Sequence, residues 1–215
     1  MSVLSKQLAT HTKEIKARAS AEALQVIEDT TQALQESGIA DRAVQAGGRV
    51  PGFCLTNQQG SERSLEQYLA AGPLVLSFYR GGWCPYCGME LGALQKELPR
   101  IAAAGGQVAA IAPETPESSL LNRERFGITY DVLFDQGAQV ASDFRLAFVV
   151  PEPLRSIYAD FGIDIPACNG DDSYRLPVSA TYIIDRDSTV AYRYFDVDYA
   201  HRLEPEIIVE ELEKL

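Results

Sequence analysis

Apolar residues recur at helical spacing through the first 37 residues, and short apolar runs then alternate with helical patterns along the rest of the chain. In residues 3–37 the apolar positions recur at roughly helical spacing with Lys, Glu and Gln between them, which predicts helix. These positions are Leu4, Leu8, Ile15, Ala19, Ala23, Val26, Ile27 and Leu34. Because Ser37-Gly38 supplies a stop and the loop-like residues 47–52 follow, we expect residues 1–46 to form an N-terminal helical arm. It would pack on the main domain or on a second subunit; a frayed surface helix is the alternative.

From residue 51 onward, the pattern predicts a mixed sheet with helices on both faces. Strands are predicted at 74–79, 108–112, 132–134, 179–184 and 189–195, and helices at 89–104, 116–126, 153–161 and 204–215. The last two strands flank Asp185-Arg186-Asp187-Ser188, whose Asp and Ser residues suit a tight hairpin turn. This order of elements is typical of an α/β fold. Since the chain has no internal repeat and no low-complexity linker, we expect residues 47–215 to form one domain.

The composition excludes several classes of protein. The chain is 46% hydrophobic and 23% charged, as in ordinary globular proteins. With 30 acidic against 19 basic residues, it carries a net charge of −11 and no Lys/Arg cluster, which predicts no nucleic-acid partner. No apolar run approaches the roughly 18 residues of a membrane helix, and residues 1–12 lack the apolar core of a signal peptide. We therefore expect a cytoplasmic protein that does not bind membranes.

The candidate chemistry lies in the turn Trp83-Cys84-Pro85-Tyr86-Cys87, between the predicted strand 74–79 and the next helix. Pro85 suits the first helical position, because its missing N–H would be unpaired there in any case. Cys84 would then be the N-cap, facing unpaired N–H groups and the positive end of the helix dipole. Both features favour a thiolate, and Arg80 would add a positive charge.

Cys87 falls in the first turn of the same helix and on roughly the same side as Cys84. We therefore expect Cys84 to attack the substrate and Cys87 to resolve the product as a disulfide. Gly81 and Gly82 would let the chain turn sharply and leave room for a substrate to approach the sulfur.

The other candidate ligands are isolated, so we expect no metal and no cofactor. A zinc site built on the two cysteines would need two more ligands, and none of the remaining Cys and His residues forms a second pair; they are Cys54, Cys168, His11 and His201. Cys54 is predicted to be a small buried hydrophobic residue. Cys168 is predicted to be a loop thiol, with a second resolving role as the alternative, and both histidines are expected at the surface.

The cysteine turn resembles the active site of the thioredoxin superfamily. A wider pattern resembles the alkyl hydroperoxide reductase/thiol-specific antioxidant (AhpC/TSA) family, the peroxiredoxins, over roughly residues 47–215. The matching segments are residues 50–55, Gly60, Leu65, residues 73–79 and residues 180–187. The resemblance implies a thioredoxin-like fold and a thiol peroxidase that reduces hydrogen peroxide or organic hydroperoxides.

That resemblance also implies recycling by thioredoxin or a similar dithiol. From their position beside Cys84, we expect Gly82, Trp83 and Pro85 to contact the substrate. The arm makes a homodimer the expected assembly. Two alternatives stay open: a thiol-disulfide oxidoreductase acting on protein disulfides, and a redox-sensing protein without an efficient substrate.

Two positions depart from the family pattern. Peroxiredoxins place Thr or Ser three residues before the attacking cysteine, where this chain has Gly81. They also use an Arg from the late strand, at the position of Ser179. Arg80 is the expected substitute for the missing helpers, with Arg175 and Arg145 as weaker candidates.

Overall fold

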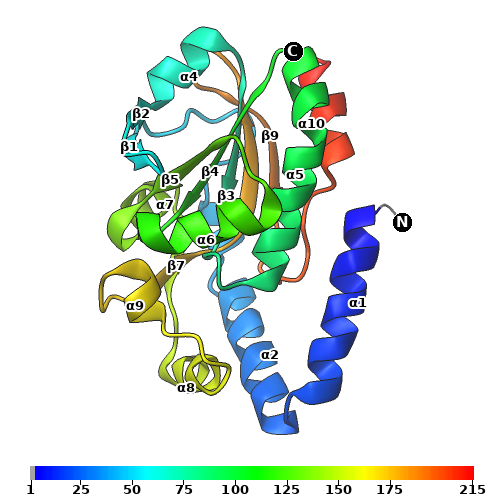
Figure 1. The fold of residues 1–215 in the computed structure, drawn as a ribbon, viewed down its shortest axis with the longest axis vertical. Helices are drawn as coiled ribbons and strands as arrows, with labels where there is room; N and C mark the ends of the chain where they lie inside the picture. The colour runs from blue at the N-terminus through cyan, green and yellow to red at the C-terminus, as the bar shows by residue number, and fades with distance from the viewer. Residues whose placement is uncertain (1–2) are drawn as a thin grey trace.

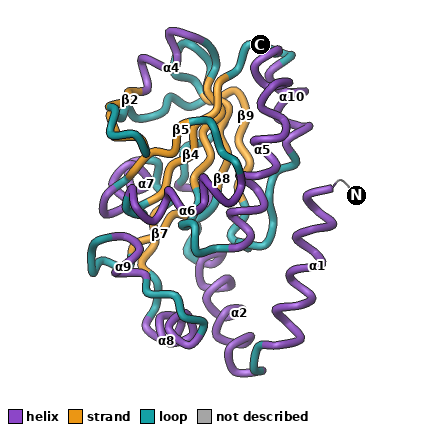
Figure 2. Tube along the Cα trace, in the orientation of Figure 1, coloured by secondary structure: helices purple, strands orange, loops and turns teal. Residues whose placement is uncertain are grey.

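A seven-stranded mixed sheet forms the centre of the computed structural model, which describes residues 3–215 apart from the side chains of residues 121 and 122. Its strand order is β2-β1-β5-β4-β3-β8-β9, with β3 labelled in Figure 1 and β8 in Figure 2. The strands are β1 (Cys54–Asn57), β2 (Glu62–Ser64), β3 (Leu74–Phe78), β4 (Gln107–Ala112), β5 (Asp131–Phe134), β8 (Ala180–Ile184) and β9 (Val190–Phe195). β3, β4 and β5 run parallel, whereas β1, β2, β8 and β9 pair antiparallel with their neighbours.

Helices cover both faces of this sheet. One face packs against α5 (Pro85–Ala103) and α10 (Pro205–Leu212), and the other against α4 (Leu65–Ala71) and α7 (Gln139–Asp143). Alternate residues of β3 enter the two cores, with Val75 in one and Leu76 in the other, as the period of two along a strand requires. The predicted α/β fold with a mixed sheet and helices on both faces is therefore confirmed.

The remaining elements lie beside the sheet. They are α3 (Ile39–Arg42), α6 (Pro116–Phe126), the short 3₁₀ helix η1 (Gln136–Ala138), α8 (Glu152–Asp160), α9 (Ile165–Asn169) and a two-stranded ribbon of β6 (Ala147–Val149) and β7 (Arg175–Pro177). The α6 bounds match the predicted helix because Thr115 caps it, Pro116 starts it and Gly127 ends it in the left-handed region. The ribbon and α9 were not predicted, because their segments are too short to show a period.

The N-terminal segment contains two helices rather than the single predicted one. α1 (Val3–Arg18) and α2 (Ala21–Glu36) are separated at Ser20, whose backbone is extended and whose hydroxyl accepts a hydrogen bond from the Ala23 amide. Such a cap starts a new helix. α1 packs on α5 and α2 packs on α8, so the two helices diverge as a V (Figures 1 and 2).

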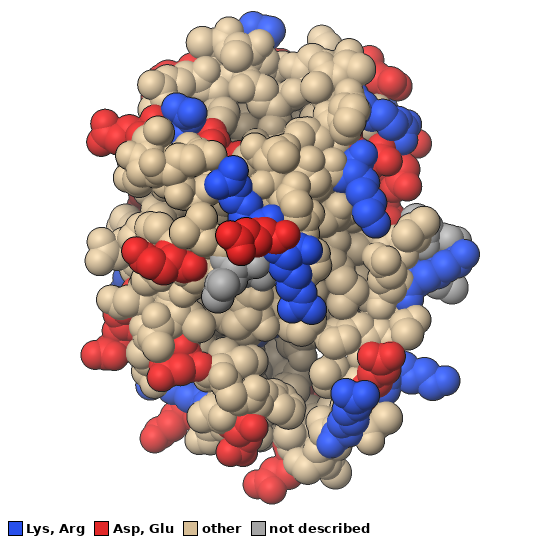
Figure 3. Space-filling view, viewed as in Figure 1, with Lys and Arg blue, Asp and Glu red and all other residues tan. Residues whose placement is uncertain are grey.

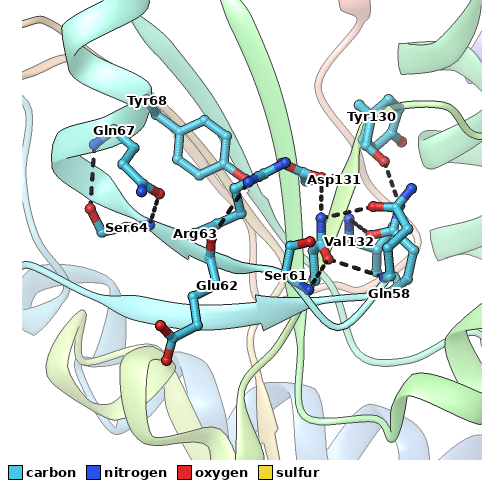
Figure 4. Close-up of polar contacts among 12 residues, drawn as sticks. Gln58, Ser61, Glu62, Arg63, Ser64, Gln67, Tyr68, Tyr130, Asp131 and Val132 are labelled. Atoms are coloured by element: carbon cyan, nitrogen blue, oxygen red, sulfur yellow. Dashed lines mark hydrogen bonds and ion pairs between the residues drawn. The ribbon is translucent and has the colours of Figure 1, made fainter.

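A carboxylate joins the β1–β2 hairpin and α4 to the rest of the sheet (Figure 4). Asp131, at the start of β5, accepts hydrogen bonds from the Tyr68 hydroxyl at 2.7 Å and from Asn57 Nδ2 at 2.7 Å. Arg63 Nε donates to the same carboxylate at 2.9 Å. One half-buried side chain thus holds residues from β1, β2 and α4. All the residues of this network lie outside the cysteine turn.

Charged side chains of both signs are interspersed on the face shown in Figure 3. Within residues 3–215, no helix is both long and apolar enough to cross a membrane.

Candidate active site

The cysteine turn connects the end of β3 to the start of α5. Cys84 is the N-cap of α5 and Pro85 is its first residue, as predicted. The turn closes through a hydrogen bond from the Cys84 amide to the Gly81 carbonyl at 3.1 Å, and the Gly88 amide donates to the Cys84 carbonyl at 3.1 Å. Both thiols are free, and their side chains are buried, with Cys84 2% and Cys87 0% exposed.

Gly81 has a backbone conformation that excludes a side chain. Its φ is +143°, in the region that favours glycine. A Cβ built on Gly81 would lie 2.4 Å from Nε1 of Trp83, closer than any real contact. The indole thus fills the space in which the family's Thr or Ser would sit, which explains that departure in physical terms.

Arg80 places its guanidinium beside the sulfur of Cys84. Its Nη1 lies 3.8 Å from Cys84 Sγ, and its Nη2 donates to the Tyr158 hydroxyl. The guanidinium carbon lies 4.9 Å from the Trp83 ring centroid and 4.4 Å from that of Tyr199. Contacts with aromatic faces suit a planar cation that is shielded from water, so Arg80 is held in place as a buried positive charge.

A second cation lies beside Cys87. Arg202 Nη2 is 3.5 Å from Cys87 Sγ, and Arg202 Nε forms an ion pair with Glu90 Oε2 at 2.6 Å. Ser77 and Thr181 hydroxyls also donate to Glu90, each at 3.4 Å. Sequence reasoning missed both charged residues. Glu90 follows Cys87 by three residues on the same helical face, a spacing that could have identified it, whereas nothing in the sequence places Arg202 there.

These surroundings separate the acidities of the two thiols. Burial opposes ionisation of Cys84, but the hydrogen bond from Cys87 and the charges of Arg80 and Arg202 outweigh it and lower the pKa of Cys84 to about 5. Burial raises the pKa of Cys87 well above its usual value, and the hydrogen bond and negative charge of Cys84 raise it further. At neutral pH the site therefore holds one thiolate, on Cys84, and one thiol, on Cys87.

Two buried carboxylates adjoin this pair. Burial raises the pKa of Glu90 to about 7, and Cys87 adds to the rise while Arg202 opposes it. Burial also raises the pKa of Glu114. Its carboxylate oxygens accept hydrogen bonds from the Gly82 amide, at 2.7 Å, and from the Tyr79 hydroxyl. The Gly82 amide is thus engaged by a side chain that the sequence did not identify.

The expected substrate contacts adjoin Cys84 in the chain: Gly82 and Trp83 are half-buried, and Pro85 is exposed. Trp83 packs on Tyr158, with ring centroids 5.4 Å apart, and Pro85 starts α5. Ser179, at the position of the family's late-strand Arg, is buried, and its hydroxyl has no hydrogen-bond partner among the residues that the structure describes. Sequence analysis did not identify Tyr158 or Tyr199, which come from α8 and from the segment after β9.

The other cysteine and histidine candidates come from segments outside the cysteine turn. The prediction that Cys54 is buried was wrong: it lies on β1, one strand from the sheet edge, and is exposed. Cys168 is half-buried in α9, and burial raises its pKa. His201 is exposed and pairs with Asp196 at 2.8 Å.

His11, by contrast, meets the Tyr86 ring edge-on at 5.0 Å. Arg175 lies exposed on β7, and Arg145 is an exposed residue with a φ of +60°. Among residues 3–215, no group of three or more His, Cys, Asp or Glu side chains is arranged to hold a metal ion.

Comparison with curated proteins gives relatives of two kinds. The chain is 30% identical over 105 residues to the thiol-disulfide oxidoreductase ResA of Geobacillus kaustophilus (strain HTA426), which covers 48% of this chain and 59% of ResA. It is 26% identical over 151 residues to the chloroplastic peroxiredoxin Q of Suaeda salsa, which covers 70% of this chain and 60% of that protein. The chain thus spans about three fifths of the length of each of these relatives.

Solved structures and a family model agree with the architecture. Peroxidoxin BcpB from Mycobacterium tuberculosis matches with a TM-score of 0.63 at 20% identity, over 80% of this chain and 98% of that one. AhpC from Enterococcus faecalis matches with a TM-score of 0.61 at 17% identity, over 80% and 92% of the two chains. At these identities the matches show the fold alone. The model of the AhpC/TSA family matches residues 46–193, more than half of the sequence, and the chain therefore belongs to the AhpC/TSA family.

Proposed function

We propose that this protein is a thiol peroxidase in which Cys84 attacks a peroxide and Cys87 resolves the product. The observation that carries this proposal is the Arg80 guanidinium, 3.8 Å from a sulfur whose pKa is lowered. A thiolate is the nucleophilic form of cysteine, and a fixed cation beside it can also stabilise the negative charge that develops on a leaving oxygen.

In the first step, the Cys84 thiolate attacks one peroxide oxygen and the O–O bond breaks. The sulfur is oxidised by two electrons to a sulfenic acid, and the other oxygen takes up a proton and leaves as water or an alcohol. Arg80 faces the reacting sulfur, and its aromatic neighbours keep the guanidinium in position.

In the second step, Cys87 attacks the oxidised sulfur, the disulfide forms and water leaves. Cys87 is poorly acidic while Cys84 is a thiolate, because the neighbouring negative charge opposes its ionisation. Oxidation of Cys84 to a neutral sulfenic acid removes that charge, while Arg202 remains 3.5 Å from the Cys87 sulfur. The resolving thiol thus becomes more acidic only after the first step is complete.

A peroxide-consumption assay on Cys84→Ser and Cys87→Ser variants tests the proposal. Cys84→Ser should lose all turnover. Cys87→Ser should consume about one equivalent of peroxide and stop at a sulfenic acid that a dimedone probe labels. Unchanged turnover in Cys84→Ser would contradict the proposal.

A second function, thiol–disulfide exchange with protein substrates, is favoured by the unequal acidities of the two thiols and by the similarity to ResA. A cysteine that is stable as a thiolate is a good leaving group, so its disulfide is oxidising. Reduction of insulin at a higher kcat/KM than that of any peroxide would favour this function. The homodimer, the cytoplasmic location and the division of the chain at residue 46 stay predictions.

A further inference from the structure

A cleft between α1 and α2 adjoins the cysteine turn. The two helices diverge from Ser20 (Figures 1 and 2), and the cavity between them has a volume of about 910 Å³. This volume lies within the range of roughly 300–1,000 Å³ that small-molecule sites occupy. Tyr86 and Tyr199 line the cleft on its inner side, and Tyr86 stands between the two cysteines in the sequence.

Tyr199 separates the cleft from the attacking sulfur. Its ring meets Tyr86 edge-on at 5.3 Å, and the Arg80 guanidinium lies 4.4 Å from its centroid. Arg80 in turn contacts Cys84 Sγ. Tyr199 belongs to the irregular segment between β9 and α10, so rotation of this one side chain would connect the cleft to the sulfur without moving the sheet.

The charges around the cleft favour a ligand that is negatively charged at one end and positively charged at the other. Glu28, Glu36 and Asp198 line it, and Lys16 is the single basic residue in the described lining. Arg80 lies behind Tyr199 on the inner side. A molecule with a thiolate at one end and an ammonium group at the other would place each charge near groups of opposite sign.

The walls favour a small molecule over a globular partner. α1 packs on α5 and α2 packs on α8, so helices flank both sides of the approach to Tyr86 and Tyr199. Ile15, Leu24 and Ile27 contribute half-buried apolar surface to these walls. A protein dithiol would have to bring its own backbone close to Cys84, between the two helices, whereas a narrow thiol fits the space that is present.

We propose that this cleft binds the thiol that returns the oxidised protein to its dithiol form, and that this thiol is a small molecule with an ammonium group. The proposal rests on the proposed function, in which a Cys84–Cys87 disulfide forms. One thiolate attacks the Cys84 sulfur, forming a mixed disulfide and releasing the Cys87 thiolate, which takes up a proton. A second thiolate attacks the small-molecule sulfur of that mixed disulfide, and the Cys84 thiolate and a small-molecule disulfide leave. The two thiols supply the two electrons.

The test measures the reduction step alone. The protein is oxidised with diamide, and its reduction by cysteamine is followed through the fluorescence of Trp83, the one tryptophan of the chain. We expect Glu28→Gln/Glu36→Gln to lower the second-order rate constant about three- to tenfold, as expected for removal of two exposed charges near a cation. The matched control Glu22→Gln/Asp29→Asn makes the same change in charge on α2, at residues outside the cleft lining, and should leave the rate constant unchanged.

Two further measurements complete the test. With 3-mercaptopropionate, which is anionic, Glu28→Gln/Glu36→Gln should keep or raise the rate constant. Gln35→Phe, which narrows the cleft, should slow reduction by cysteamine, whereas Gln25→Phe, on α2 outside the lining, should not.

Equal rate constants in the cleft variants and their controls would overturn the proposal. A second outcome would also overturn it: faster reduction by micromolar reduced thioredoxin than by millimolar cysteamine, both in wild type and in Gln35→Phe. Because diamide replaces the peroxide in this test, the reduction rates do not depend on peroxidase activity. A failure of the peroxidase proposal would be seen in the separate peroxide assay.

Discussion

Arg202 Nη2 lies 3.5 Å from the sulfur of Cys87, although 115 residues separate the two in the chain. The same guanidinium pairs through Nε with Glu90, and the two charged side chains are only 1% and 3% exposed. A charge in such a place is tolerated only when it is paired. Glu90 therefore holds Arg202 in position, and Arg202 places a positive charge where it would stabilise a thiolate of Cys87 in the proposed resolving step.

Replacement of Arg202 alone should destabilise the protein strongly. Arg202→Gln leaves the Glu90 carboxylate buried without its cation, and breaking a buried pair in this way costs about 3–5 kcal/mol. Urea unfolding at pH 8, where Glu90 is mostly ionised, measures this loss. The double variant Glu90→Gln/Arg202→Gln should recover part of the free energy of unfolding, because neither charge then remains.

The double variant also separates stability from chemistry. After one equivalent of peroxide, it should form the sulfenic acid of Cys84 but close the disulfide with Cys87 more slowly than wild type, since no cation stabilises the resolving thiolate. Rapid-quench alkylation followed by mass spectrometry measures both steps. Disulfide closure at the wild-type rate would show that Arg202 has a structural role only.

The pH dependence of Cys84 reactivity should report the effect of the Arg80 charge on the thiol pKa. The pKa of Cys84 is lowered to about 5, so the thiolate is fully present near pH 7 and is lost as the pH falls through 5. Iodoacetamide alkylation, measured in a Cys54→Ser/Cys168→Ser background, should be nearly constant from pH 9 to pH 6 and have its midpoint near 5.

Arg80→Gln should raise that midpoint by at least about one unit, which corresponds to about 1.4 kcal/mol of lost thiolate stabilisation. Arg80→Lys keeps the charge and serves as the control, with a smaller shift. A wild-type midpoint near the ordinary thiol value of 9 would contradict the assignment of Cys84 as the nucleophile.

The parts that the sequence predicted share a local cause. The apolar run that becomes β3 and the Pro at the first position of α5 depend on neighbouring residues alone, so Cys84 could be placed at the helix N-cap without the fold. Arg80 lies two residues after the end of β3 and could be identified as the nearby cation for the same reason.

The parts that were missed depend on distant packing or on position within the sheet. Arg202 and Tyr199 lie in an irregular segment with no period, and only the close approach of that segment to α5 brings them to the cysteines. Cys54 was predicted from the usual burial of its residue type. It is exposed because β1 lies one strand from the sheet edge, where its outward side chain is not covered.

The Asp131 network should contribute stability without affecting the chemistry (Figure 4). Burial opposes ionisation of Asp131, but hydrogen bonds from Tyr68, Asn57 and Arg63 outweigh it and keep the pKa of this carboxyl below its usual value of 3.8. Asp131→Asn should lower the free energy of unfolding by about 1–3 kcal/mol at neutral pH and leave peroxide turnover unchanged.

The contribution of the Asp131 carboxylate to the free energy of unfolding should depend on pH. A lowered carboxyl pKa stabilises the folded state above the unfolded value of 3.8, and that stabilisation is lost as the pH falls through the lower folded value. The difference between wild type and Asp131→Asn should therefore shrink in acid. Glu62→Gln changes an exposed carboxylate on β2, beside Arg63, and should have almost no effect. A difference between Asp131→Asn and wild type that is independent of pH would contradict this account.

Restoring the family's hydroxyl at Gly81 should harm the protein rather than improve it. Gly81→Thr would force a side chain onto a backbone with φ of +143° and place its Cβ 2.4 Å from Trp83 Nε1. Backbone strain of this kind costs about 1–3 kcal/mol, and the steric overlap adds a similar amount.

Gly81→Ala carries the same Cβ without a hydroxyl, so the two variants should lose stability and peroxide kcat/KM to a similar extent. Adding Trp83→Ala to Gly81→Thr should recover the part due to overlap but not the part due to strain. If Gly81→Thr alone folded as stably as wild type and consumed peroxide faster, Trp83 would have to move aside readily, and the indole would not be what excludes a hydroxyl from this turn.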